Sequence, residues 1–239
     1  MERVGRIEAI WRHPVKGMRG ERIAEAEVRW SGISGDRRYA FVRGDDDSHF
    51  PWFTARTAAG LLEYAPHFVE PERPRGSAVR VRSPGGLERA VDDAALLAEL
   101  SALQGGPLHL LHSGRGLHDA SPLSLIGSAS IASLCEAAAV PVQPRRFRNN
   151  FVIGGVGAFA EENWVGRTLQ LGDGDDAPRI RVDRRNERCI VITLDPETLE
   201  QTSELLSSLA LTREACVGLY ASVVQPGMAR EGCDVFILS

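Results

Sequence analysis

Short apolar stretches separated by turn residues dominate this sequence, and they predict a chain built mostly from β-strands. Residues 79–82 alternate apolar and charged side chains, and residues 87–91 follow them across Pro84-Gly85-Gly86, which is typical of a β-hairpin. Further strands are predicted at residues 4–11, 26–30, 38–42, 108–112, 151–153, 180–182, 190–194, 217–224 and 235–238.

Three segments carry apolar residues at helical spacing instead. The first starts at Asp92 or Asp93, which can cap it, and stops at Gly105-Gly106, and the others cover residues 128–139 and 204–209. Many strands and few helices predict a β-rich α+β fold with barrel-like sheets. The end of the first helix is the candidate domain junction, so we expect one domain over residues 1–103 and a second over residues 104–239.

Composition and charge narrow the classes of function. The chain has 239 residues and a formal net charge of −4, which argues against a general nucleic-acid binder. It contains no run of about 18 apolar residues that would predict a membrane span. The first residues are charged rather than apolar, so we expect no signal peptide and a cytoplasmic location.

Four cysteines lie far apart, and none forms the CxxC pair of a zinc site or a redox dithiol. Cys189 follows Arg188 at the start of a predicted strand, where cationic neighbours favour the thiolate that binds soft metals. The commoner role of a lone cysteine in a strand is that of a small buried apolar side chain. Cys135 and Cys216 fit that role, and Cys233 fits an exposed turn.

Arginines gather in two stretches of this acidic chain. Guanidinium groups bind phosphate through paired hydrogen bonds, so such clusters can form an anion pocket, although a solvated face is an equally common explanation. The first cluster comprises Arg145, Arg146 and Arg148, and the second comprises Arg179, Arg181, Arg184, Arg185 and Arg188.

Histidine and serine patterns give less support to other chemistry. The histidines lack the spacing of metal ligands on one element, which disfavours a zinc site. His118, Asp119 and Ser121 are the residue types of a catalytic triad, but neighbours along a chain rarely form one and no Gly-x-Ser-x-Gly motif is present. A serine hydrolase is therefore disfavoured.

A series of short motifs along nearly the whole chain resembles the MOSC-domain family, named for the C-terminal domain of molybdenum-cofactor sulfurases, together with the β-barrel domain that often precedes it. The order and spacing of the motifs, rather than any one of them, carry the resemblance. They are residues 10–20 (IWRHPVKGMRG), 32–39 (GISGDRRY), 53–56 (FTAR), 119–125 (DASPLSL), 146–153 (RFRNNFVI), 158–166 (AFAEENWVG), 188–189 (RC), 195–198 (DPET) and 218–221 (GLYA).

The resemblance implies an N-terminal β-barrel-like domain, a MOSC β-barrel with a few helices, and molybdenum cofactor (molybdenum bound to molybdopterin) in a basic cleft between them. The cysteine of the Arg-Cys motif is the metal-binding or sulfur-carrying residue of the family, and it maps onto Cys189. The residues implied to contribute to the basic cleft are Lys16, Arg37, Arg56, Arg148 and Arg188. Those implied to supply hydrogen bonds are Asp119, Ser121, Asn150 and Tyr220.

Three positions depart from the family pattern. Gly17 replaces the usual serine after the lysine of the first motif, which removes one hydroxyl. Asn149 stands where a proline is common, and Leu199 stands where a glycine often follows Asp-Pro-x-Thr.

The resemblance favours a molybdenum-dependent oxidoreductase that reduces N-hydroxylated substrates such as amidoximes and hydroxylamines, with Cys189 as the metal ligand. An alternative is a sulfur carrier or cofactor-handling protein that uses Cys189 as a persulfide or binding residue. A third is a metal-free cysteine enzyme with His118 as base. No ferredoxin-type cysteine set is present, so we expect a separate electron-donor protein beside the small-molecule substrate, and neither nucleic acid nor membrane as a partner.

Overall fold

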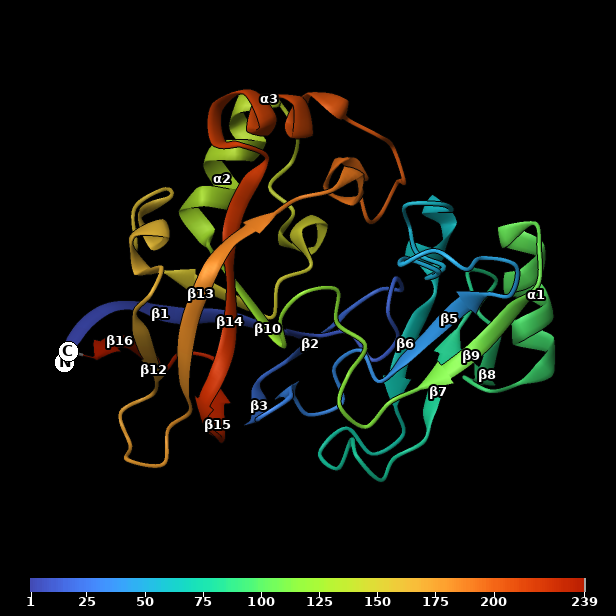
Figure 1. The fold of residues 1–239 in the computed structure, drawn as a ribbon, viewed down its shortest axis with the longest axis horizontal. Helices are drawn as coiled ribbons and strands as arrows, with labels where there is room; N and C mark the ends of the chain where they lie inside the picture. The colour runs from blue at the N-terminus through green and yellow to red at the C-terminus, as the bar shows by residue number, and fades with distance from the viewer. Residues whose placement is uncertain (239) are drawn as a thin grey trace.

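The computed structural model describes residues 1–238, which form two lobes of β-structure joined side by side. The larger lobe holds a closed sheet with two helices at one end, and the smaller lobe holds the short strands and a third helix (Figure 1). The first and last strands pair, Glu2 opposite Ile237, so the start of the chain lies beside residue 238. The molecule is β-rich, as its apolar pattern predicted.

The large sheet has eight strands in the order β11-β10-β14-β13-β12-β16-β1-β2, and it closes because β11 also pairs with β1. Strand β13 shows why these segments form a barrel: Ile180 and Val182 point inward and are fully buried, while Arg181 and Asp183 between and after them are exposed. The strands are β1 (Glu2–Arg12), β2 (Glu21–Ile23), β10 (Leu123–Gly127), β11 (Phe151–Gly154), β12 (Thr168–Leu171), β13 (Arg179–Glu187), β14 (Cys216–Gln225) and β16 (Asp234–Leu238).

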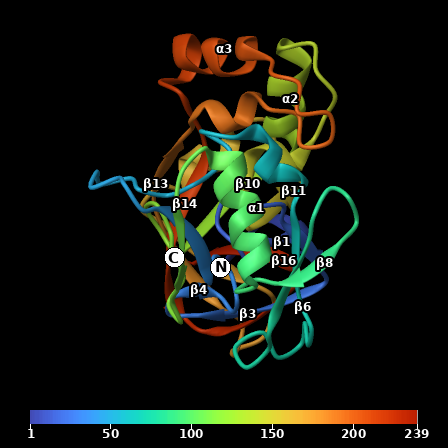
Figure 2. The same ribbon diagram turned by 90° about the vertical axis from the view of Figure 1, so that its right-hand side faces the viewer.

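The smaller lobe is built around a separate apolar core that includes Phe41, Phe53 and Leu100. Its helix α1 (Ala94–Gln104) covers the outer side of the lobe, facing the viewer in Figure 2. Asp93 caps α1 by accepting hydrogen bonds from two backbone amides, and Gly105 ends it in the left-handed conformation, as the sequence predicted. The strands are paired as β5 (Tyr39–Arg43) with β9 (Leu108–His112), and β6 (Ala65–Phe68) with β7 (Val79–Arg82) and β8 (Glu88–Ala90).

The remaining elements lie on the large lobe or between the lobes, except for the first 3-10 helix, which belongs to the smaller lobe. Helices α2 (Ser128–Ala137) and α3 (Ser203–Arg213) pack on each other at the upper end of the closed sheet (Figure 1). A three-stranded sheet joins β15 (Gly227–Arg230), β3 (Glu25–Arg29) and β4 (Gly32–Ile33). Four 3-10 helices complete the fold: η1 (Ala59–Glu63), η2 (Pro144–Phe147), η3 (Ala160–Trp164) and η4 (Ile190–Thr193).

Strands from the start of the chain pair with strands from its end. Strand β1 belongs to the closed sheet of the C-terminal strands, and β3 pairs with β15 near the C-terminus. The apolar core of the large lobe accordingly joins Ile7 and Val28 to Leu219 and Val235. The domain boundary between residues 103 and 104 stays a prediction, and the first strands contribute structure to both sides of it.

One predicted element is wrong in type. Residues 190–194 were expected to form a strand because they are apolar and β-branched, but residues Ile190–Thr193 form the 3-10 helix η4. Ile192 packs into the cluster of α2 and α3, whereas Leu194 packs against Ala55 and Leu62 of the smaller lobe. Because this turn must contact both lobes within a few residues, tertiary packing overrides its strand propensity.

Candidate functional site

Cys189 lies in an open pocket between the two lobes. The space between protein atoms in this pocket, including the open solvent at its mouth, is about 760 Å³. Both lobes contribute to its wall. The lining residues are Lys16, Gly17, Arg37, Phe50, Thr54, Ala55, Arg56, Asp119, Ser124, Arg146, Phe147, Arg148, Asn186, Glu187, Arg188, Cys189, Val191, Ile192 and Tyr220.

Cys189 occupies the junction between β13 and η4, not the start of a strand as predicted. Its backbone is extended, and its carbonyl accepts the Ile192 amide at 3.2 Å to open the 3-10 turn. The thiol is free and half-buried. The apolar residues of η4 anchor this junction to both lobes, so the position of Cys189 between them is fixed by packing.

Arg188, which precedes Cys189, holds the neighbouring loop of residues 147–149 through its guanidinium group. Its guanidinium donates to the Phe147 carbonyl and, at 3.5 Å, to the Asn149 side-chain oxygen. Burial lowers the pKa of Arg188, and the nearby Arg37 adds to this, while Tyr220 and Cys189 oppose it. Arg188 therefore holds the segment that presents Arg148.

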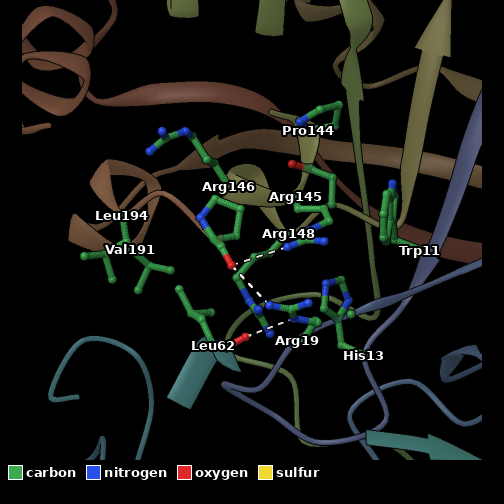
Figure 3. Close-up of a pocket in the computed structure, with 13 residues that line it drawn as sticks. Trp11, His13, Arg19, Leu62, Pro144, Arg145, Arg146, Arg148, Val191 and Leu194 are labelled. Carbon is green, nitrogen blue, oxygen red and sulfur yellow. Dashed lines mark hydrogen bonds between the residues drawn. The ribbon is translucent and has the colours of Figure 1, made fainter. Parts of the chain in front are cut away.

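Arg148 brings an unpaired cation into the pocket. Its backbone is in the left-handed region (φ 52°), and within residues 1–238 its guanidinium has no hydrogen bond or ion pair. Burial and then the Arg37 charge lower its pKa to about 10, while Asp36 and Cys189 oppose the shift. Figure 3 shows Arg148 with Arg145 and His13 in the narrower cleft that adjoins this pocket. A half-buried cation without a counter-ion favours an anionic ligand.

Lys16 and Asp119 form an ion pair at the wall of the pocket. The Lys16 ammonium contacts the Asp119 carboxylate, donates to the Leu117 carbonyl at 2.7 Å and lies 4.9 Å from the centre of the Trp52 ring. Burial lowers the pKa of Lys16, although Asp119 opposes this. Asp119 is exposed, so an incoming anion can compete with it for the ammonium.

A buried network centred on Asp36 positions Arg37. The Asp36 carboxylate accepts the His13 amide at 2.7 Å and the Asn150 side-chain amide at 3.1 Å, and it pairs with Arg37. Burial alone would raise the pKa of Asp36, but Arg37 and then His13 hold it far below its usual range. The Arg37 guanidinium also donates to the Arg148 carbonyl at 3.1 Å, which ties the two cationic residues together.

We expect His13 to make stability depend on pH. His13 is 2% exposed, and burial followed by the Arg148 charge lowers its pKa from 6.5 to about 3, although its contact with Asp36 opposes the shift. Between these values the unfolded chain binds a proton that the folded chain excludes, so stability is lost as pH falls below 6.5. Each such proton changes the free energy of unfolding by about 1.4 kcal/mol per pH unit.

Denaturant unfolding at a series of pH values would measure this slope. His13→Gln should flatten it by about one proton, whereas His49→Gln, at an exposed position, should leave it unchanged. Equal slopes for His13→Gln and the parent chain would contradict the interpretation.

A narrower cleft adjoins the Cys189 pocket through Arg146 and Arg148, which line both. In this cleft Arg19 and Arg145 both donate to the Pro196 carbonyl, at 3.5 and 3.3 Å (Figure 3). Arg146 pairs with Asp195 at 2.5 Å, and Asp195 also accepts the Glu197 amide. The Asp-Pro-Glu-Thr segment therefore serves as the acceptor for Arg145 and Arg146 of the first arginine cluster.

The structure brings together most of the residues predicted for the site, but not all of them. Ser121 and Asn150 do not line the pocket: Asn150 lies behind it, where it bonds Asp36 and Ser124. His118 also lies outside the pocket and is half-buried, with its ring nitrogen 3.2 Å from the Ser31 carbonyl, so it is not placed as a base for Cys189. Arg179, Arg181, Arg184 and Arg185 extend along β13 away from the pocket.

Several pocket residues had not been singled out. Phe50 and Arg56 pack together at the mouth, with the guanidinium 4.2 Å from the ring centre, and only Arg56 was predicted. Thr54 and Phe147 belong to two of the family-like motifs, at residues 53–56 and 146–153, so their place in those motifs was the available signal. Phe50 belongs to no such motif, and nothing in its local sequence indicates the pocket.

The backbone conformation and crowding at Gly17 explain why this chain has glycine where the family usually has serine. Its φ is +86°, and a Cβ atom there would lie 2.9 Å from the Leu61 side chain and 3.1 Å from Cα of Thr54. Gly17→Ser should therefore destabilise the protein by about 2–3 kcal/mol, from left-handed strain plus the clash. Thermal or denaturant unfolding would measure the loss.

Gly86→Ser is the matched control, because Gly86 has φ +81° but a Cβ atom added there would meet nothing within 4 Å. It should lose only about 1 kcal/mol, from backbone strain alone. Equal losses at the two positions would show that crowding at Gly17 is unimportant.

The fold and the pocket define a two-lobed β-barrel protein in which basic side chains from both lobes surround one cysteine. The sequence profile of the MOSC domain matches residues 112–236, and that of the MOSC N-terminal β-barrel domain matches residues 4–99. The chain belongs to the MOSC-domain family.

Two curated relatives align over the full chain, and a third aligns over about half of it. Mitochondrial amidoxime-reducing component 1 of Homo sapiens is 25% identical over 294 aligned residues, which cover 100% of this chain and 84% of the human protein. The same component of Mus musculus is 24% identical with the same coverage. Mitochondrial amidoxime reducing component 2 of Rattus norvegicus is 32% identical over 114 residues, 46% of this chain and 32% of the rat protein.

Among solved structures, the YuaD protein of Bacillus subtilis is similar with a TM-score of 0.48 and 11% identity, over 97% of this chain and 93% of that protein. None of the helices within residues 1–238 is long and apolar enough to cross a membrane.

Proposed function

We propose that this protein is a molybdenum-cofactor-dependent oxidoreductase that reduces N-hydroxylated or related N–O compounds, with Cys189 as the protein ligand of the metal. The observation that carries the proposal is the half-buried Arg148 guanidinium, unpaired within residues 1–238, in the same pocket between the lobes as the free thiol of Cys189. Membership of the MOSC family and the names of the amidoxime-reducing relatives supply the reaction class.

The residues present fit this cofactor. The cofactor carries a phosphate and a dithiolene, both anionic, and Lys16, Arg37, Arg148 and Arg188 provide cations from both lobes. Within residues 1–238 no three His, Cys, Asp or Glu side chains are grouped so that they could hold a metal ion by themselves. A metal at Cys189 therefore needs its other ligands from a cofactor, which a dithiolene supplies.

When bound, the cofactor supplies the two-electron chemistry that removes oxygen from the N–O group. The chain would supply the sulfur of Cys189 as a soft ligand and the pocket cations that orient the phosphate and dithiolene. Val191 and Ile192 exclude water from the inner wall, while Phe50 and Arg56 at the mouth contact the incoming substrate. Arg188 acts through the loop that it holds, because its donors are directed to Phe147 and Asn149.

The electron donor and the cell compartment are part of the same proposal. A separate protein would supply the electrons, because the sequence contains no ferredoxin-type cysteine set. We also propose the cytoplasm as location, which cell fractionation tests.

Purification from a host that makes the cofactor, followed by elemental analysis and an assay with reduced viologen dye and an amidoxime, tests the proposal. We expect molybdenum in up to stoichiometric amount and amidoxime reduction that scales with it. Protein with ample cofactor supply but no molybdenum would overturn the proposal. Molybdenum without turnover, or persulfide on Cys189, would instead favour a cofactor-handling or sulfur-carrying protein.

A further inference from the structure

A second basic pocket lies against the segment that precedes Arg37, and it shares no lining residue with the Cys189 pocket. The space between its protein atoms, including the mouth, is about 710 Å³. Its wall combines residues 34–36 with the loop of residues 113–116, whose sequence is Ser-Gly-Arg-Gly.

The pocket carries an excess of positive charge. Four arginines line it, and two of them, Arg75 and Arg115, are exposed and have no side-chain hydrogen bond or ion pair within residues 1–238. Arg38 donates to the Pro74 carbonyl at 2.6 Å, so its charge is not neutralised either. The only carboxylate in the wall among the described residues is Asp36, and that group is already paired with Arg37.

Hydroxyl and backbone donors are available beside these cations. Ser34 lines the pocket and is 6% exposed, yet its hydroxyl has no hydrogen-bond partner within residues 1–238. A buried hydroxyl without a partner destabilises a protein unless a ligand or water completes it. Gly114 in the opposite wall has open space around it, so a ligand can approach its backbone closely.

We propose that this pocket binds a tetrahedral oxyanion, either inorganic phosphate or the phosphate group of a small phosphate monoester. Arg75 and Arg115 supply free guanidinium forks, Arg38 adds a third charge, and the unpartnered Ser34 hydroxyl in the same wall can donate a hydrogen bond. The site is independent of the proposed cofactor site, because the two pockets have separate walls.

The position of the site gives it a structural relation to the Cys189 pocket. Ser34 and Asp36 lead directly into Arg37, and the 113–116 loop leads into Leu117 and Asp119, both of which contact Lys16. A bound oxyanion would therefore rest on the two segments that carry Arg37 and Asp119. For this reason, a binding experiment must distinguish an anion bound in this pocket from an anion bound in the Cys189 pocket.

Calorimetric titration of the full chain with inorganic phosphate or with glycerol 3-phosphate, at constant ionic strength set with sodium chloride, tests the proposal. The titrations use the Arg148→Ala background, which weakens anion binding in the Cys189 pocket. The variant pair Arg75→Ala and Arg115→Ala should weaken phosphate binding at least about tenfold, since two charge-assisted contacts are lost. Arg167→Ala, at another exposed arginine without an ion pair within residues 1–238, should leave it unchanged.

The two ligands identify the source of the phosphate group. Glycerol 3-phosphate binding as well as or better than inorganic phosphate supports a phosphorylated metabolite, whereas binding of phosphate alone supports the free ion. Absence of saturable binding of either ligand overturns the proposal. So does an equal loss of affinity in Arg167→Ala and the double variant, because that result indicates a general charge effect.

Ser34→Ala provides a second measurement. Without phosphate it should be at least as stable as the parent chain, because it removes an unpartnered buried hydroxyl. With phosphate, its melting temperature should rise less than that of the parent chain. If phosphate raises the melting temperature of Ser34→Ala and of the parent chain equally, Ser34 does not contact the phosphate. If phosphate raises the melting temperature of the Arg75→Ala and Arg115→Ala double variant as much as that of the parent chain, the proposed site is wrong.

Discussion

Replacing Cys189 by serine should reduce molybdenum-dependent turnover more than about 100-fold, because even outer-shell partners of metal ligands typically contribute about 10–100-fold to metal affinity or activity. A hydroxyl stays protonated at neutral pH and is a poor ligand for a soft metal. The fold should survive with a change in stability within about 1 kcal/mol, because Cys189 is half-buried and serine has nearly the same volume. Activity per bound molybdenum, molybdenum content and thermal unfolding are the three measurements.

Cys233→Ser is the matched control. Cys233 is also free and half-buried, but it lies in a turn near β16 and does not line the pocket. It should retain full turnover and full molybdenum content. Equal activity per bound molybdenum in Cys189→Ser and the parent chain would refute the ligand assignment, and with it the mechanism proposed for this pocket.

The local elements of the fold were predictable because they depend on residues close together in the chain. The cap at Asp93 and the glycine at 105 mark the ends of α1, and alternation at 79–82 marks a hairpin strand. Closure of the large sheet was not predictable in this way. It depends on β1 pairing with β11, more than 140 residues later, for example Ile7 with Ile153, and neither segment contains a local signal for its partner.

The error at residues 190–194 has the same physical origin. Apolar, β-branched residues favour a strand locally, but Ile192 and Leu194 must reach different clusters on the two lobes. A 3-10 turn directs them to both sides, whereas residues two apart in a strand point to the same face. The requirement is set by the other lobe, which the local pattern does not describe.

The candidate site was predicted through motifs rather than through geometry. The resemblance pointed to Lys16, Arg37, Arg148 and Cys189, and the structure places all four around one pocket. It also pointed to Asn150, which supports the pocket from behind. Asp36 lies within the motif at residues 32–39 but was given no role, because a buried carboxylate acquires its function only from the distant partners that surround it.

Replacing Asp36 by asparagine should destabilise the protein by about 3–5 kcal/mol, the typical loss when one partner of a buried ion pair is removed. The amide cannot neutralise Arg37, and in either orientation its nitrogen would face donors: Arg37 and Asn150 on one side, or the His13 backbone amide on the other. Arg37 would then be an additional uncompensated cation beside Arg148. Denaturant unfolding at neutral pH measures the loss.

A double-mutant cycle with Arg37→Gln separates the ion pair from general packing. Each single variant leaves a buried charge unpaired, so the double variant should lose markedly less than the sum of the two single losses. Glu25→Gln is the control: its partner Arg230 lies 3.2 Å away and both side chains are more than half exposed, so it should lose at most about 1 kcal/mol. Additive losses at Asp36 and Arg37 would show that their buried pairing does not hold this part of the pocket together.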